Sequence, residues 1–244
     1  MSANWDDDFE TWRNEKLDKQ IENTEFLDLS QKWMQSSVDA NYSYQFDWLG
    51  VPIIQMPGDL LVFQDIVFRT RPDLIIETGV ARGGSINFWA SILSLCEIEG
   101  EVLGIDIDIR PHAKQALADS RFKDSIKIIE GSSTSSDVLS QVKQIVSLHK
   151  KVMVVLDSNH THEHVISELN NYADFVTAGC FLLVLDTVID DLIPYEGRDW
   201  GPGQSPKSAV LQFMNDNPGK FENTPRYEAR AGLSVAPLGY WVRN

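Results

Sequence analysis

Two apolar runs in the second half of the chain each end in an aspartate, and the residues around these ends could bind a metal and move a proton. Asp157 ends one run and Asp186 ends the next. Carboxylates at neighbouring strand ends can share a divalent cation, and oxygen ligands suit Mg²⁺ or Mn²⁺. His160 lies on the turn just after Asp157, where an imidazole can serve as a general base. The pattern favours a metal site beside a base, although both aspartates could instead cap the segments that follow them.

His160 belongs to an alternating triplet with His162 and His164, and such a cluster also raises the question of zinc or iron. Side chains spaced by two near the start of a helix do not all face one point. We therefore expect His162 and His164 to cap the helix or to lie on the surface. His160 remains the candidate base, because it lies on the turn just after Asp157.

A glycine-rich segment, Glu77–Ser85, reads E-T-G-V-A-R-G-G-S and joins an apolar run to an amphipathic one. A strand that feeds a helix through glycines brings backbone N–H groups close to a ligand, with the helix N-terminus behind them. The dinucleotide fingerprint G-x-G-x-x-G does not occur in the chain. Glycine-rich turns of this kind are also found in α/β proteins that bind no nucleotide. As a cofactor loop, the segment would act through Glu77, Gly79, Gly83 and Ser85.

The next two apolar runs end in residues that suit the rest of a nucleotide. Asp106 closes the run Glu101–Asp106, about 20–30 residues beyond the glycine loop, where an acid can accept both hydroxyls of a ribose. The run Ile126–Glu130 leads into a Gly-Ser-Ser turn, and its Ser132 is placed to flank an adenine. The ends of three successive apolar runs therefore each carry residues that could bind one part of a nucleotide. Together they strengthen the prediction of a nucleotide cofactor.

These side chains require strands that all end at one edge of a sheet. Continuous apolar runs, typical of parallel strands covered on both faces, occur at Leu74–Glu77, Val102–Asp106, Ile126–Glu130, Val152–Asp157 and Phe181–Asp186. Helical patterns lie between them, notably at Ile86–Leu95, Val138–Leu148 and Val165–Tyr172. This alternation predicts an α/β fold with a mostly parallel, seven-stranded sheet.

The two ends of the chain depart from the alternation. Residues 1–57 predict an N-terminal arm, helical to about Asn41 and then aromatic and extended, ahead of a main domain over residues 58–244. At the other end, Leu233–Ala236 and Tyr240–Arg243 flank a Pro-Leu-Gly turn. We expect these two segments to form a terminal antiparallel hairpin.

Several of these segments resemble known methyltransferases. The spacing Glu-x-Gly-x-x-x-Gly at residues 77–83 is similar to the first loop of S-adenosylmethionine (SAM) methyltransferases, where the loop cradles the amino-acid end of the cofactor and the acid lies beneath it. A wider resemblance, over roughly Tyr42 to Arg243, is to the family of cephalosporin hydroxylases and rhamnosyl O-methyltransferases. The matching segments are Glu77–Ser85, Leu156–His162, Leu185–Thr187, Trp48–Gln55 and Trp200–Gly203.

The resemblance implies a Rossmann-like SAM methyltransferase fold, an oligomer, and metal-assisted O-methylation of a hydroxyl on a sugar, glycosylated natural product or polysaccharide. It implies that Asp157 is a metal ligand at the cofactor site and that His160 is the base. The family usually has two adjacent acids at the end of the fifth strand, whereas here Leu185 precedes Asp186. Thr187, a water or a substrate oxygen would then complete the metal shell.

The connection Val188–Pro206 is long for a strand–helix link, and long links are often lids or binding loops. Its Tyr195, Arg198 and Trp200 could stack on and hydrogen-bond to a sugar ring. An interface loop packed on another subunit is the alternative.

Composition excludes several classes of partner. The 244 residues carry a formal net charge of −15, which repels nucleic-acid phosphates. No apolar run is long enough to span a membrane, and the polar, acidic start is unlike a signal peptide. The two cysteines fit buried thiols in a reducing compartment. We expect a cytoplasmic enzyme that acts on a small molecule or a glycan.

Three other functions remain open from the sequence. An iron-dependent hydroxylase would combine Asp157 with His160 or His162, but would leave the glycine loop and Asp106 without a purpose. A SAM-binding partner subunit without catalysis would explain the missing acid at Leu185. Methyl transfer from SAM without a metal is the third.

Overall fold

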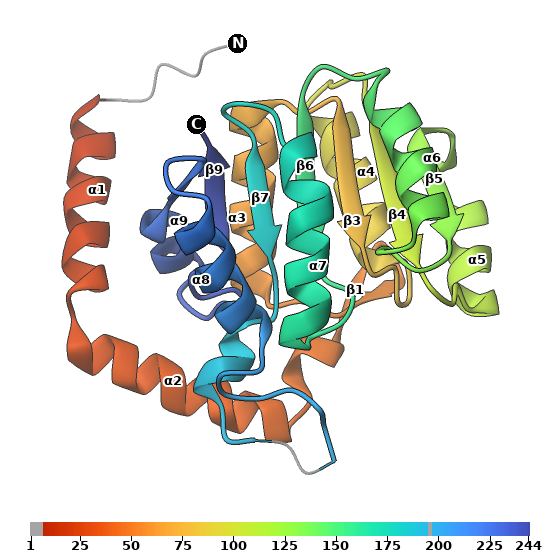
Figure 1. The fold of residues 1–244 in the computed structure, drawn as a ribbon. Coiled ribbons are helices and arrows are strands. Elements are labelled where there is room, and N and C mark those ends of the chain that lie inside the picture. The colour runs from red at the N-terminus through yellow and green to blue at the C-terminus, as the bar shows by residue number, and fades with distance from the viewer. Residues whose placement is uncertain (1–6, 195–196) are drawn as a thin grey trace.

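The computed structural model describes residues 7–194 and 197–244, and its centre is a seven-stranded sheet with helices on both faces (Figure 1). The strand order is β5-β4-β3-β6-β7-β9-β8. The parallel strands are β3 (Leu74–Thr78), β4 (Glu101–Asp106), β5 (Ile126–Glu130), β6 (Val152–Leu156) and β7 (Phe181–Val184). All the predicted apolar runs are therefore strands, and the predicted α/β fold is confirmed.

The antiparallel end of the sheet is formed by a different pair of segments from the one expected. Strand β9 (Tyr240–Arg243) pairs with β7 and with β8 (Phe221–Asn223), both antiparallel. The prediction of a strand at Leu233–Ala236 is wrong. That segment is irregular because a buried carboxylate, Asp59, accepts hydrogen bonds from Val235 N and the Ser234 hydroxyl at 2.8 and 2.7 Å.

Six helices cover the two faces of the sheet. One face packs against α3 (Pro57–Thr70), α4 (Gly84–Leu95) and α5 (Pro111–Ala118). The other packs against α6 (Ser136–Val146), α7 (His162–Tyr172) and α8 (Pro206–Asp216). Alternate residues of each central strand enter these two apolar cores, which explains why the strands are apolar at every position.

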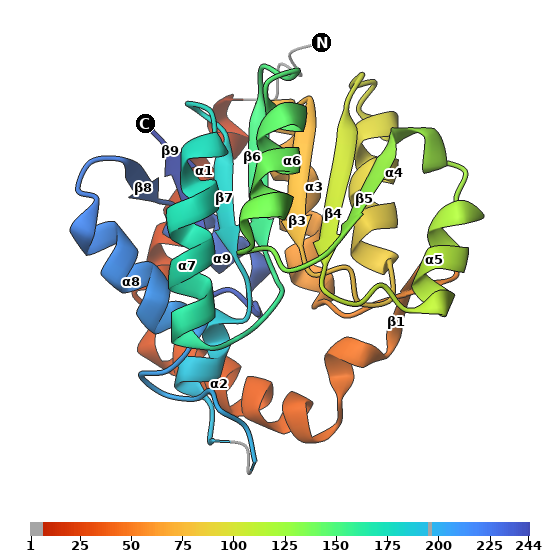
Figure 2. The ribbon, with the colours of Figure 1, turned by 45° about the vertical axis from the view of Figure 1, so that its right-hand side comes forward.

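The N-terminal segment forms a helical arm, as predicted, and ends in a small hairpin. Its elements are α1 (Asp7–Ile21), α2 (Thr24–Asp39), the 3₁₀ helix η1 (Tyr42–Tyr44), β1 (Phe46–Trp48) and β2 (Val51–Ile53). Helix α1 lies beside α9 (Pro225–Ala231), where Arg226 Nη2 and Asp18 Oδ2 are 2.9 Å apart. Helix α2 and the hairpin then pass along the edge at which β3, β6 and β7 end (Figures 1 and 2).

The hairpin is fixed to the main body of the molecule by its contacts with α4. Trp48 Nε1 donates to the Ser91 hydroxyl at 2.9 Å. Gly84, the first residue of α4, has no space for a Cβ because the Pro52 carbonyl lies against it. Residues 46–56 are therefore packed into the sheet domain rather than held apart from it.

Three 3₁₀ helices, η2 (Lys123–Ser125), η3 (Ala173–Phe175) and η4 (Thr187–Asp191), complete the described elements. Within the described residues, no helix combines the length and apolar character needed to cross a membrane. Tyr195 of the predicted lid lies outside the described residues.

Candidate active site

The carboxyl ends of β3 and β6 touch each other, and this contact creates the site. The Asp157 N–H donates to the Thr78 carbonyl at 2.9 Å. A Cβ on Gly79 would collide with the Asp157 carbonyl, and Gly79 has a φ of 97°. Only glycine combines this conformation with such a close approach. Gly79 therefore allows the glycine loop to lie directly against Asp157.

Asp157, Asp186 and His160 come together at this edge of the sheet, as the sequence analysis expected. His160 Nδ1 lies 3.3 Å from Asp186 Oδ2. The pKa of Asp157 is raised well above its ordinary value, first by burial and then by the negative charges of Asp186 and Glu77. Asp157 and Asp186 are thus two acidic side chains close enough to influence each other.

Asp186 reaches this position because β7 ends two residues earlier than expected. Leu185 is buried, and its N–H donates to the Leu156 carbonyl at 3.0 Å. Asp186 then has a φ of 55°, the left-handed conformation, at the start of η4. The side chain is thereby turned toward the end of β6.

Thr187, which was expected to complete a metal shell, has its side chain in the interior of the protein. Its side chain is fully buried and its hydroxyl donates to the Pro237 carbonyl at 2.6 Å. The structure therefore assigns Thr187 to the packing of η4 on the C-terminal segment. Within residues 7–194 and 197–244, no group of three or more His, Cys, Asp or Glu side chains is arranged to hold a metal.

The side chains of His160, His162 and His164 contact different parts of the protein, as their spacing predicts. His162 contacts α8, with its ring nitrogens 2.7 Å from the Ser208 hydroxyl and 3.1 Å from Gln212 Oε1. His164 lies 3.2 Å from the Ser133 and Ser158 hydroxyls. An iron site that uses His162 is therefore not formed.

Glu77 lies beneath the glycine loop and does not reach the cleft. Its side chain is fully buried, and its two oxygens accept hydrogen bonds from the Ser85 hydroxyl at 2.9 Å and Trp89 Nε1 at 3.2 Å. Burial raises the pKa of Glu77 to about 8. Both oxygens of Glu77 are thus engaged within the protein, and its contact with a cofactor stays a prediction. Glu77 and Ser85 hold the first turn of α4 onto β3.

Asp106 also supports the loop. One of its oxygens accepts hydrogen bonds from the Val80 and Ala81 N–H groups at 2.8 and 3.1 Å, and the other accepts from the Asp108 N–H at 3.1 Å. A carboxylate has about four acceptor sites, so capacity for ribose hydroxyls is left. Gly83, with a φ of 88°, is the N-cap of α4 at the far side of the same loop.

The predicted adenine side is formed by the turn after β5. The Ser132 and Thr134 hydroxyls are 3.1 Å apart, and the Gly131 N–H donates to the Asp106 carbonyl at 2.8 Å. Asp106 and Ser132 are therefore neighbours on adjacent strand ends, as the strand order requires.

One polar residue of the site was not assigned a role by the sequence analysis. Gln55, just after β2, donates from Nε2 to Asp157 Oδ2 at 3.0 Å. Its side chain is only 3% exposed. An amide that follows an apolar strand carries no motif, so the only available signal was its place in the segment that resembles the methyltransferase family.

The long connection after β7 reaches the base from the other side. The rings of His160 and Trp200 meet edge to face with centroids 5.9 Å apart, and the Arg198 guanidinium lies over the Trp200 ring at 5.5 Å. The connection thus brings an aromatic side chain to the edge of the site.

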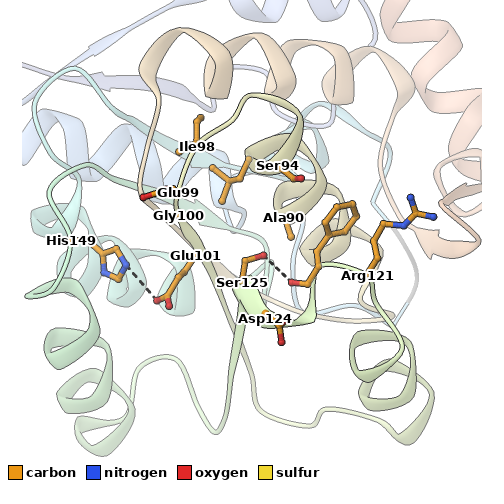
Figure 3. Close-up of a pocket in the computed structure, with 12 residues that line it drawn as sticks. Ala90, Ser94, Ile98, Glu99, Gly100, Glu101, Arg121, Asp124, Ser125 and His149 are labelled. Atoms are coloured by element: carbon orange, nitrogen blue, oxygen red, sulfur yellow. Dashed lines mark hydrogen bonds and ion pairs between the residues drawn. The ribbon is translucent and has the colours of Figure 1, made fainter.

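A cavity of about 620 Å³ lies elsewhere (Figure 3). It is lined by the starts of β4 and β5, including Glu101, Ser125 and His149, with His149 Nε2 3.4 Å from Glu101 Oε2. Parallel strands place their starts and ends at opposite edges, and α/β enzymes bind ligands at the ends. No residue of the candidate site lines this cavity.

Comparison with known proteins identifies related sequences and folds. The model of the Rhamnosyl O-methyltransferase/CmcI family matches residues 40–244. A rhamnosyl O-methyltransferase of Mycobacterium leprae (strain TN) is 27% identical over 203 residues, covering 81% of this chain and 82% of that protein. One of Mycobacterium tuberculosis (strain ATCC 25618 / H37Rv) is 27% identical over 199 residues, covering 81% and 78%.

Solved structures share the fold. The apo structure of CmcI-N160 superposes with a TM-score of 0.61 at 18% identity, covering 82% of this chain and 76% of that one. CmcI-D160 with Mg and SAM gives a TM-score of 0.60 at 17% identity, covering 82% and 77%. The family resemblance expected from the sequence is thus confirmed, and the chain belongs to the Rhamnosyl O-methyltransferase/CmcI family, with the fold of SAM-dependent methyltransferases.

Proposed function

We propose that this protein transfers a methyl group from SAM to a hydroxyl of a sugar or glycosylated natural product, with a divalent metal at Asp157 and Asp186 and with His160 as base. Its family is one of O-methyltransferases. The proposal rests on one observation: Asp157, Asp186 and His160 lie close together beside the glycine loop.

The site has the polar groups that SAM requires. Asp106 and Ser132 lie on adjacent strand ends and offer acceptors to the ribose and the adenine. Gly79 lets the glycine loop approach the Asp157 backbone closely. Two buried polar atoms at this edge, Gln55 Oε1 and Thr78 Oγ1, have no hydrogen-bond partner, which is typical of groups that a ligand satisfies.

The same edge suits Mg²⁺ or Mn²⁺. Asp157 and Asp186 are two oxygen donors whose charges repel each other, and magnesium commonly binds through one or two carboxylates while keeping several waters. Water or two hydroxyls of the acceptor would supply the remaining ligands. When bound, the metal would lower the pKa of the hydroxyl to be methylated.

Proton transfer falls to His160. Its contact with Asp186 fixes the ring, while the rest of the imidazole is available to the acceptor. The acceptor oxygen forms a bond to the SAM methyl carbon, the carbon–sulfur bond breaks to give a neutral thioether, and His160 takes the hydroxyl proton. Holding the donor and the acceptor in line can contribute about 7–11 kcal/mol.

A sugar acceptor fits the surroundings of the base. The mycobacterial relatives named above act, by their names, on rhamnosyl groups. Trp200 offers an aromatic face next to His160, and aromatic rings pack well on the C–H faces of sugars. We assign the connection Val188–Pro206 to acceptor binding on this basis.

We also propose that the protein is a cytoplasmic homo-oligomer. The helical arm exposes large apolar side chains that a second copy could cover: Phe9, Trp12, Phe26, Leu27, Leu29 and Trp33. Light scattering tests this, since a monomer at micromolar concentration contradicts it, and Trp12→Lys should shift an oligomer toward smaller species.

The first experiment is calorimetric titration of SAM in magnesium and in chelator, followed by mass spectrometry of methyl transfer to a panel of deoxysugar glycosides. Micromolar SAM binding and a mass gain of one methylene on an acceptor support the proposal. The absence of SAM binding in both buffers overturns it.

A further inference from the structure

Gln55 connects the N-terminal segment to the centre of the site through one end of its side chain only. Its Nε2 atom donates to Asp157 Oδ2 at 3.0 Å. Its Oε1 atom is buried and has no hydrogen-bond partner, although the side chain is only 3% exposed. A buried carbonyl oxygen without a donor is unfavourable, and native proteins retain few of them.

The orientation of the amide follows from Asp157. Asp157 Oδ2 accepts the hydrogen bond from Nε2, so the NH₂ group of Gln55 faces the carboxyl. The carbonyl oxygen is then directed to the other side, where no described protein group donates to it. A molecule that binds in the site can therefore supply the missing donor.

The strand order identifies which part of SAM reaches Gln55. The nucleoside is assigned to β5 and β4 through Ser132 and Asp106, and β3 and β6 follow next in the sheet. SAM bound across these strand ends therefore presents its amino-acid end to β3 and β6, where Gln55 is joined to Asp157.

The charge around Gln55 favours the ammonium group over other donors. Asp157, which the amide contacts, and Asp186 at the neighbouring strand end give this edge of the sheet a negative local field. Within the described residues, no lysine or arginine is recorded in contact with Asp157 or Asp186. The positively charged α-ammonium of SAM satisfies both the field and the unpaired oxygen.

We propose that Gln55 is a cofactor-binding residue whose carbonyl oxygen accepts a hydrogen bond from the α-ammonium group of SAM while its amide nitrogen positions Asp157. The inference depends on the proposed function, because it requires that the chain bind SAM. It makes the hairpin segment part of the active site.

The test compares two ligands that differ only at the amino-acid end. S-adenosylhomocysteine keeps this end, whereas 5′-methylthioadenosine lacks it and keeps the nucleoside. Their dissociation constants are measured by calorimetry in chelator, so that no metal contributes, for the wild type and for Gln55→Met. Methionine has a similar volume and no hydrogen-bonding amide.

We expect Gln55→Met to weaken S-adenosylhomocysteine binding about 10- to 100-fold, the range for a hydrogen bond to a charged group. Binding of 5′-methylthioadenosine should change less than threefold. Gln45→Met is the control, because Gln45 is exposed and donates only to the Ala40 carbonyl, and it should bind both ligands like the wild type.

The outcomes separate the inference from the proposed function. If the wild type binds neither ligand, the SAM-dependent function fails and the inference fails with it. If the wild type binds S-adenosylhomocysteine and Gln55→Met binds it equally well, only the inference is overturned. An equal loss for both ligands would mean that Gln55 merely supports the fold of the site, and this also overturns the inference.

Discussion

The Nδ1 atom of His160 lies 3.3 Å from Oδ2 of Asp186, which fixes the candidate base before any ligand binds. The two residues come from the ends of neighbouring strands, β6 and β7. Asp186 holds this position in a left-handed backbone conformation, with a φ of 55°. Such strain, about 1–3 kcal/mol at a non-glycine residue, is concentrated at functional sites. The contact therefore holds the imidazole in one orientation.

Replacing His160 by alanine should reduce kcat about 10²–10⁴-fold, the usual contribution of a general base. SAM affinity should stay close to that of the wild type, since His160 is not among the groups assigned to the cofactor. Single-turnover kinetics and calorimetry measure the two quantities. His162→Ala is the matched control because His162 contacts α8 instead of the site. Unchanged turnover in His160→Ala would remove it from the mechanism.

Asp106→Ala should weaken binding of SAM and of 5′-methylthioadenosine by similar factors, about 10–100-fold. The substitution removes a ribose acceptor and also frees the Val80 and Ala81 N–H groups that shape the loop. Asp108→Ala is the control, since Asp108 is exposed and gives Asp106 only a backbone N–H. Equal affinity of Asp106→Ala and the wild type, measured by calorimetry, would contradict the assignment of Asp106 to the ribose.

Asp157→Asn should abolish the heat of Mg²⁺ or Mn²⁺ binding, because a neutral amide replaces one of two carboxylates. Binding of SAM in chelator should be retained, and methyl transfer should lose its dependence on metal. Asp47→Asn in the exposed part of the hairpin is the control and should titrate like the wild type. If the Asp157→Asn protein binds metal with wild-type affinity, the ion lies elsewhere.

Much of the fold could be predicted because the central strands are apolar at every position. Both faces of β3, for example, are fully buried. Strand β8 could not be predicted, because Phe221–Asn223 is short and has one apolar residue. Leu233–Ala236 was assigned in its place because it is apolar. Its backbone instead satisfies the buried Asp59, and a hydrogen bond between residues 176 positions apart leaves no local pattern.

The candidate site could be predicted in its residues but less well in their roles. Asp157, His160 and Asp186 follow from the rule that ligands bind at strand ends. Glu77 was expected to contact the cofactor, whereas Ser85 and Trp89 occupy both of its oxygens. Gln55 was missed because its bond to Asp157 joins residues 102 positions apart. Spacing identifies which side chains share an edge, but their hydrogen bonds depend on tertiary packing.

Glu77→Gln should raise the thermal stability of the protein at pH 8 and change it little at pH 5. Burial raises the pKa of Glu77 from 4.5 to about 8 in the folded protein. Between these two values the folded state holds more protons than the unfolded state, so the free energy of unfolding falls as the pH rises. A neutral glutamine removes this loss. It still offers one oxygen to Ser85 or Trp89, so the hydrogen bonding at low pH is largely kept.

Calorimetric unfolding at pH 5, 6.5 and 8 measures the effect, and the melting temperature of Glu77→Gln should exceed that of the wild type by about 5 °C or more at pH 8. The difference should shrink steadily toward pH 5, because a protonated glutamate and a glutamine are both neutral. Glu163→Gln, on the exposed side of α7, is the control and should follow the wild type at every pH. A difference that is constant with pH, or that grows toward pH 5, would mean that Glu77 is charged in the folded protein and that a cation near the glycine loop stabilises it.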